Sequence, residues 1–189
     1  MMRTQTADRA SKSHSVYRMV TIAVLTAVLC VVCPITVPLG LIPFSLSNFV
    51  LFLALYLIGK RGSIICCAVY IVMGALGLPV FSGFAGGLGH LLGPTGGYIL
   101  GYIPMLFVSG VIFERFQNNA MRVFGIIIGM LICYVVGTVH YCVILKVSLV
   151  SALAICVVPF LLGDLAKIVL VVSIGPMVRE RITKAVARY

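Results

Sequence analysis

Residues 159–169 read PFLLGDLAKIV and place two opposite charges, Asp164 and Lys167, inside an otherwise apolar stretch. A carboxylate or an ammonium in the hydrocarbon of a membrane costs roughly 2.5–3.5 kcal/mol on insertion scales. The spacing of three residues puts both side chains on one helical face, where each charge can offset the other. An ionisable pair at membrane depth marks a functional site by default, so we expect this pair to hold a polar ligand.

The same stretch also allows a purely structural interpretation. Pro159 and Gly163 interrupt the apolar segment 148–178, which is long for one helix, so the sequence predicts a short outer helix over 148–158 and a spanning helix over 163–178. Asp164 then lies in the first turn of the spanning helix, where the helix dipole favours a carboxylate. In this alternative Asp164 only caps the helix and Lys167 only neutralises it.

The composition identifies an integral membrane protein. Of the 189 residues, 62% are hydrophobic and 10% are charged, and the mean hydropathy is +1.22. Soluble domains have about 45–50% apolar and about 25% charged residues. Because each membrane span needs about 20 apolar residues, the chain has room for about six spans and for no soluble catalytic domain.

The apolar runs predict an all-α fold of six transmembrane helices, over residues 17–33, 45–58, 63–78, 96–113, 122–145 and 163–178. Pro34, Pro38 and Pro43 break the backbone between the first two runs, and this non-helical piece must be covered by protein rather than lipid. We expect a disordered cytoplasmic tail over residues 1–15, a membrane domain over 16–182, and a basic cytoplasmic tail over 183–189.

Basic residues gather between the apolar runs at alternate ends. The other segments between runs carry only Lys146. This positive-inside pattern places both termini and two loops in the cytoplasm. The net charge of +10 therefore indicates contact with anionic lipid headgroups rather than with nucleic acid. The clusters are Arg3, Arg9, Lys12 and Arg18; Lys60 and Arg61; Arg115 and Arg122; and Arg179, Arg181, Lys184 and Arg188.

Residues 77–98 read GLPVFSGFAGGLGHLLGPTGGY, with eight glycines and two prolines among 22 residues. Such a run does not form a plain helix, and glycine permits positive φ and close backbone approach. The run interleaves Phe and Leu and carries no Lys or Arg, so we expect it to pack on the outer side. A packed glycine-rich loop over a membrane pocket is typical of a ligand lid, which we place at residues 77–97. The phosphate-binding motif with Gly-Lys-[Ser/Thr] is absent.

The seven cysteines all lie in apolar runs and are interpreted as small buried hydrophobic residues. Cys30 and Cys33 have the two-residue gap of redox and zinc sites, but no partner cluster accompanies them. We therefore expect neither a metal nor another cofactor.

Three strings of this sequence resemble the BioY family: GLPVF at 77–81 with the glycine-rich run that follows it, GPTGGYILGY at 93–102, and PFLLGDLAK at 159–167. That family is the biotin-specific substrate-binding component, or S component, of energy-coupling factor (ECF) transporters. The resemblance covers residues 16–178. It implies a six-helix protein of the prokaryotic cell membrane that binds biotin from outside and is not an enzyme.

The resemblance also implies a partner module of one transmembrane coupling protein and two ATP-binding cassette (ABC) ATPases. Ala23 and Ala27, four residues apart in the first span, match the small-residue motif by which such S components dock on the coupling protein. The S component is expected to topple in the membrane, which moves its pocket from the outer to the inner face.

Asp164 and Lys167 match the ligand-contacting acid and lysine of the family. Biotin's ureido ring has two N–H donors and one carbonyl acceptor, which a carboxylate and an ammonium complement. The resemblance implies that the apolar part of biotin lies against Phe81, Phe84 and Tyr98, beneath a lid that includes Gly86.

The sequence departs from the family at Ser47, where glutamine is common, and at Phe84 and Ala85, which interrupt the glycine run. These departures leave open which group meets the biotin carboxylate. His90 and Asn48 are candidates; otherwise His90 faces solvent or backbone, and Asn48 hydrogen-bonds the broken backbone nearby.

The residues leave three other functions to be distinguished. An S component for another vitamin, such as riboflavin or thiamine, is the nearest alternative. A membrane enzyme could use Asp164 and Lys167 as acid and base, but the chain offers no nucleophile–base pair and no metal constellation. A purely structural subunit would have no need of a lid.

Overall fold

The computed structural model describes residues 2–38, 43–116 and 118–186, and most of them are helical. Two shorter helices, α3 (Leu88–Leu92) and α6 (Leu149–Cys156), lie between the long ones, with single turns of 3₁₀ helix at Ser82–Phe84 and Val158–Phe160. The long helices are α1 (Met2–Val32), α2 (Ser47–Ala75), α4 (Gly96–Arg115), α5 (Asn119–Leu145) and α7 (Leu161–Val186).

Six membrane-crossing segments follow from these helices. Within the described residues, four segments are long and apolar enough to cross a membrane: Ser47–Ala75, Gly96–Arg115, Asn119–Leu145 and Leu149–Ile182. A shorter apolar helix covers Val16–Val32. Gly59 has φ 70° and ψ −177° inside α2, so α2 is two helices joined at one residue. These are the predicted second and third spans, and the fold class expected from the sequence is confirmed.

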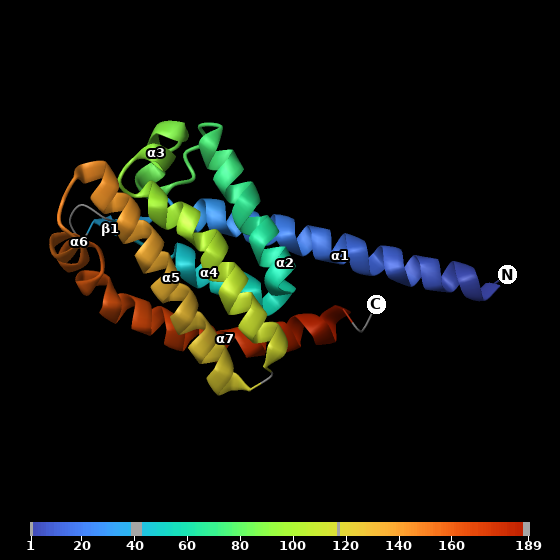
Figure 1. The fold of residues 1–189 in the computed structure, drawn as a ribbon. Helices are drawn as coiled ribbons and strands as arrows, with labels where there is room; N and C mark the ends of the chain where they lie inside the picture. Colours follow the sequence, from blue (N-terminus) through green and yellow to red (C-terminus); the bar gives the residue numbers. More distant parts are fainter. Residues whose placement is uncertain (1, 39–42, 117, 187–189) are drawn as a thin grey trace.

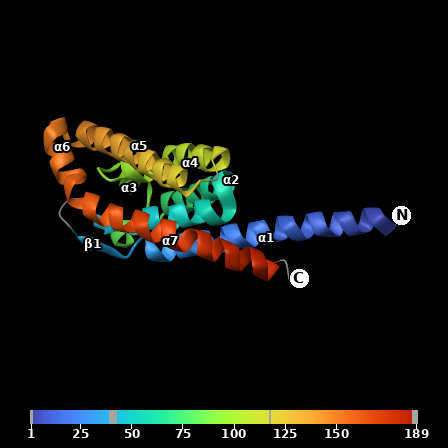
Figure 2. The ribbon, with the colours of Figure 1, turned by 90° about the horizontal axis from the view of Figure 1, so that it is seen from below.

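The helices pack around α2, which contacts α1, α4 and α7. Figure 2 shows α4 and α5 on one side of the molecule and α1 and α7 on the other, with α2 between them. The centre is filled by side chains with almost no exposure, among them Leu51, Tyr70, Met105 and Ile126. The start of α1 and the end of α7 lie on one side of the molecule, and α6 and strand β1 (Thr36–Pro38) lie on the opposite side (Figure 1). The positive-inside pattern makes the side with the chain ends cytoplasmic.

Close contact between α4 and α5 depends on glycines of both helices. A Cβ atom at Gly97 of α4 would overlap the His140 side chain of α5, and one at Gly137 of α5 would overlap the Tyr98 ring of α4. Small residues let helix backbones approach closely in membranes, where lipid supplies no hydrophobic driving force between helices. This contact fixes Tyr98 in position beside α5.

The proline-rich break between the first two spans forms two short strands, β1 (Thr36–Pro38) and β2 (Pro43–Ser45), which pair antiparallel. The non-helical piece expected there is confirmed, although the strand pairing was not foreseen. The strand pairing gives hydrogen-bond partners to backbone groups that cannot find them in a helix, because the prolines interrupt the helix here.

The N-terminal segment is helical rather than disordered. Residues 1–15 were expected to be disordered, but α1 begins at Met2. The basic cytoplasmic tail expected over residues 183–189 stays a prediction; α7 continues into it as far as Val186, and residues 187–189 lie outside the described residues. Adding a residue to an existing helix is much easier than starting one, so the spanning helices continue beyond their apolar parts.

Candidate functional site

A cavity lies at the outer end of the molecule between the lid and helices α2, α4, α5 and α7, with about 70 Å³ of space open to water-sized molecules. Its wall combines apolar and aromatic surface with a few polar groups, which is the usual character of small-molecule sites. The aromatic part comes from Tyr98, Tyr102, Tyr134 and Phe160. The polar part comes from Ser45, Asn48, Ser82, His90, Thr95, Asp164 and Lys167.

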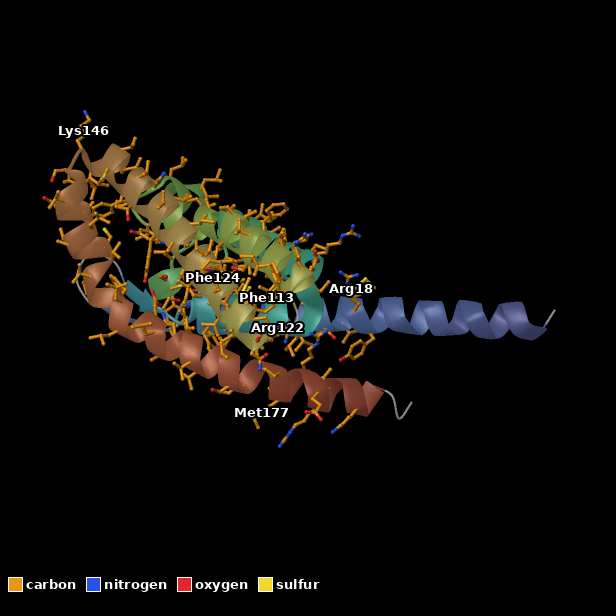
Figure 3. The ribbon with its side chains drawn as sticks, turned by 60° about the horizontal axis from the view of Figure 1, so that its bottom comes forward. Arg18, Phe113, Arg122, Phe124, Lys146 and Met177 are labelled. Atoms are coloured by element: carbon orange, nitrogen blue, oxygen red, sulfur yellow. The ribbon has the colours of Figure 1, made fainter. Side chains whose placement is uncertain are left out.

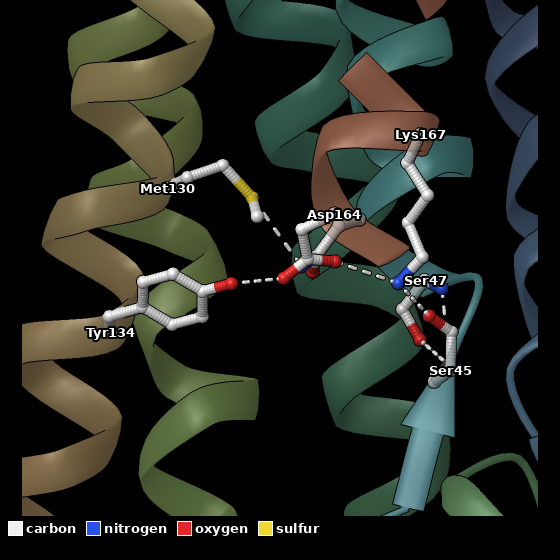
Figure 4. Close-up of polar contacts among 7 residues, drawn as sticks. Ser45, Ser47, Met130, Tyr134, Asp164 and Lys167 are labelled. Atoms are coloured by element: carbon white, nitrogen blue, oxygen red, sulfur yellow. Dashed lines mark hydrogen bonds and ion pairs between the residues drawn. The ribbon is translucent and has the colours of Figure 1, made fainter. Parts of the chain in front are cut away.

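Asp164 lies in the first turn of α7, only 5% exposed, with both carboxylate oxygens hydrogen-bonded. Lys167 Nζ lies 2.9 Å from Oδ1. The hydroxyl of Tyr134 on α5 donates to Oδ2 (Figure 4). A carboxylate has about four lone-pair sites, so Asp164 keeps acceptor capacity toward the cavity after these two bonds.

Lys167 is 6% exposed and is held by groups from two parts of the chain. Besides Asp164, its ammonium donates to the backbone carbonyl of Ser45 at the end of β2, at 2.5 Å. The strand pair therefore provides the second anchor of the ion pair. Ser47, which stands where the family has glutamine, is buried and hydrogen-bonds to Cys33 and to the hydroxyl of Ser45, away from the cavity wall.

Asn48 brings an unsatisfied acceptor to the cavity. Its side-chain nitrogen contacts the sulfur of Met130 at 3.5 Å, while its Oδ1 is buried without a hydrogen-bond partner. A buried polar atom without a partner is costly in a folded protein. Asn48 is thus suited to accept from a ligand N–H, and among the described residues its side chain makes no bond to the broken backbone nearby.

The lid is a packed structure tied to three neighbouring elements. Gly87 N donates to the carbonyl of Gly74 in α2 at 2.7 Å, and Gly83 N donates to the carbonyl of Pro34 at 3.1 Å. His140 of α5 contacts the carbonyl of Gly93 at 3.0 Å through Nε2, which ties the end of the lid to α5.

His90 faces the cavity from α3. Its Nε2 lies 3.3 Å from the Thr95 hydroxyl, and its ring stacks on Phe81 with centroids 5.4 Å apart. Burial lowers the pKa of His90 below its ordinary 6.5, because a charged imidazole loses hydration there. At neutral pH His90 therefore offers a neutral donor or acceptor to a ligand.

Three lid residues expected at the ligand are absent from the cavity wall. Phe81 is fully buried behind it, edge-on to Tyr70 with centroids 5.5 Å apart. Phe84 is 67% exposed and has φ 59°, so the local turn directs its side chain outward. A Cβ atom at Gly86 would overlap the carbonyl oxygens of Leu78 and Gly77, so Gly86 allows the lid to close on itself. The sequence indicated a packed loop, but its placement of Phe81 and Phe84 at the cavity differs from the structure.

The structure brings Asp164, Lys167, Tyr98, His90 and Asn48 together as expected. Tyr134 and the Ser45 carbonyl were missed. A tyrosine in a span gives no sequence signal, because its partner lies 30 residues away on another helix. Every residue has a main-chain carbonyl, so no pattern of residue types indicates which carbonyl will bind Lys167.

Ala23 and Ala27 lie on the exposed face of α1, while Leu25 and Leu29 are buried against the bundle. Within the described residues, no group of three or more His, Cys, Asp or Glu is arranged to hold a metal ion. Cys33 is buried against Ser47, which agrees with a packing role.

These features define a six-helix membrane protein with a lidded ligand cavity at its outer end. The chain belongs to the BioY family, whose model matches residues 2–184. The family comprises transport proteins of the prokaryotic membrane, not enzymes.

Solved and curated relatives agree with this assignment. The crystal structure of the S-component for biotin from an ECF-type ABC transporter has a TM-score of 0.82 and 25% identity, over 88% of this chain and 93% of that chain. The biotin transporter BioY of Thermotoga maritima is 36% identical over 80% of this chain and 89% of its own length. The probable biotin transporter BioY of Pyrococcus horikoshii is 32% identical over 77% and 86%, respectively.

Proposed function

We propose that this chain binds biotin at the outer face of the membrane and delivers it to the cytoplasm as the S component of an ECF transporter. The observation that carries the proposal is the buried Asp164–Lys167 pair on the wall of the outer cavity. A buried charge pair contributes little net stability, so its presence on a cavity wall favours a ligand role over capping alone.

The polar wall complements the ureido ring of biotin. Asp164 and Asn48 present acceptors for the two ureido N–H groups, and Lys167 lies beside them as a donor to the ureido oxygen. Tyr98, Tyr102 and Phe160 provide surface for the apolar bicycle and valeryl chain. A site built for this donor–acceptor pattern rejects analogues that lack it.

The ligand assignment is tested by purifying the protein, measuring biotin that co-purifies, and titrating labelled biotin. Asp164→Asn should weaken binding roughly tenfold to a hundredfold, as expected for lost hydrogen bonds to a charged group. Glu180→Gln is the matched control, because Glu180 is an exposed carboxylate of the same helix. Displacement of biotin by riboflavin or thiamine, or no biotin binding by the wild type, would overturn the assignment.

The partner module is proposed to be one transmembrane coupling protein with two ABC ATPases, docked on α1. Ala23 and Ala27 are exposed and small, as a close helix contact requires. Ala23→Trp should spare biotin binding and abolish ATP-driven uptake. Val28→Trp is the control, since Val28 is also exposed but lies about 100° around α1 from Ala27. Unchanged uptake by Ala23→Trp would show that docking occurs elsewhere.

A further inference from the structure

A second and larger cavity lies at the cytoplasmic end, between α1, α2, α4, α5 and α7, with a volume of about 760 Å³. Figure 3 shows Arg18, Phe113 and Arg122 gathered at this end, far from Lys146 at the outer end. The cavity shares no lining residue with the outer one. The transport role proposed above does not account for it.

Tyr56 of α2 brings an unsatisfied hydroxyl to this cavity. The side chain is only 2% exposed, and its hydroxyl is buried without a hydrogen-bond partner. The ring is fixed by an edge contact with Phe113, with centroids 4.9 Å apart, and by the backbone of α7, since a Cβ atom at Gly175 would lie 2.8 Å from it. The hydroxyl is therefore held in place and available to a bound group.

The charge of the cavity wall favours an anionic bound group. Four cationic side chains line it, and Glu114 is the one carboxylate among the lining residues. Glu114 pairs with Lys60 at 2.6 Å, and the lining residues as a set carry more cationic than anionic side chains. The Arg122 guanidinium lies over the rings of Tyr56 and Phe113, at 5.9 and 5.8 Å from their centroids. These contacts hold the guanidinium close to both rings, on the same wall as Tyr56.

We propose that this cavity binds a phosphate group, with Arg122 and Tyr56 as its principal contacts. Guanidinium groups match phosphate oxygens in shape and charge, and a hydroxyl adds a further donor. Two sources share this chemistry: the headgroup of an anionic phospholipid of the inner leaflet and a soluble phosphate ester. The cavity lies at the end that carries the basic clusters, where an anionic leaflet surface is met.

The test measures the thermal midpoint of the full-length protein with two probes. One probe is phosphatidylglycerol, compared with phosphatidylcholine in otherwise identical mixed micelles, and the other is glycerol phosphate in solution. The variants are Arg122→Gln, which removes the guanidinium, and Tyr56→Phe, which removes only the hydroxyl. Arg61→Gln is the matched control, because Arg61 is an exposed arginine next to the lining residue Lys60 and does not itself line the cavity.

We expect stabilisation by one or both phosphate probes, with a concentration for half effect that rises about tenfold in Arg122→Gln and severalfold in Tyr56→Phe. Arg61→Gln should behave as the wild type. Stabilisation by the lipid alone identifies a headgroup site, and stabilisation by both probes identifies a site for soluble phosphates. An equal loss in Arg61→Gln would show diffuse surface attraction and overturn the proposal. The absence of stabilisation by either probe would also overturn the proposal.

Discussion

The hydroxyl of Tyr134 on α5 donates a hydrogen bond to Oδ2 of Asp164 on α7, opposite the oxygen that accepts from Lys167. The carboxylate is thus clamped between two helices that belong to different sides of the bundle (Figures 2 and 4). A side chain fixed at both oxygens loses little freedom when a ligand arrives, which favours tight binding.

Tyr134→Phe should weaken biotin binding about fivefold while leaving the fold intact, because it removes one bond that orients the carboxylate. The measurement is titration with labelled biotin. Tyr141→Phe is the control, since Tyr141 is a buried tyrosine of the same helix that lies outside the cavity wall. Equal affinity of Tyr134→Phe and wild type would mean that Asp164 is oriented without the phenol.

Lys167→Met should destabilise the protein by about 3–5 kcal/mol, because it leaves Asp164 charged and buried without its ion-pair partner. Adding Asp164→Asn to this variant should recover most of the stability and none of the biotin binding. Thermal midpoints and titrations of the two single variants and the double variant check this. If the double variant were as unstable as Lys167→Met, packing rather than charge would explain the loss.

Gly86→Ala should open the lid, because its Cβ atom would overlap two backbone carbonyl oxygens that cannot move aside cheaply. We expect bound biotin to dissociate about tenfold faster, which corresponds to about 1.4 kcal/mol. Gly89→Ala is the matched control, since a Cβ atom at Gly89 meets nothing within 4 Å. Equally fast release from both variants would contradict a closed lid.

The stability of the protein should fall at acidic pH in part through His90. Burial lowers its pKa below 6.5 in the folded state, so the unfolded chain binds the proton more readily. The contribution of His90 is complete above pH 6.5 and is lost as the pH falls through the folded pKa. His90→Gln should therefore show a smaller fall in thermal midpoint between pH 7.5 and pH 5 than the wild type. An identical fall in both would exclude His90 as the group that titrates.

Hydropathy and charge predicted the six spans because membrane burial acts on each segment separately. The break at Gly59 could be predicted from its neighbours Lys60 and Arg61, which cannot remain in hydrocarbon. The pairing of β1 with β2 could not, because it depends on which backbone groups the neighbouring helices leave unsatisfied. The length of the terminal helices also escaped prediction, since helix growth continues past the apolar pattern.

The candidate site, like the fold, could be predicted from the sequence only in part. Asp164 and Lys167 were predictable because a charge in an apolar membrane stretch is costly, so its presence indicates a function. That neither Phe81 nor Phe84 lines the cavity was not predictable, since the turn between them contains two positive φ angles, at Gly83 and Phe84, that no residue pattern indicates. Tyr134 was not predictable either, because its role arises only when α5 and α7 come together.

The anchor of Lys167 on the main chain of residue 45 has a practical consequence. A carbonyl oxygen is supplied by every amino acid, so scanning the side chain at this position leaves the acceptor in place. Mutagenesis by ordinary substitution is therefore blind to it, and its strength is accessible only by replacing the amide between residues 45 and 46 with an ester, which makes the oxygen a poorer acceptor.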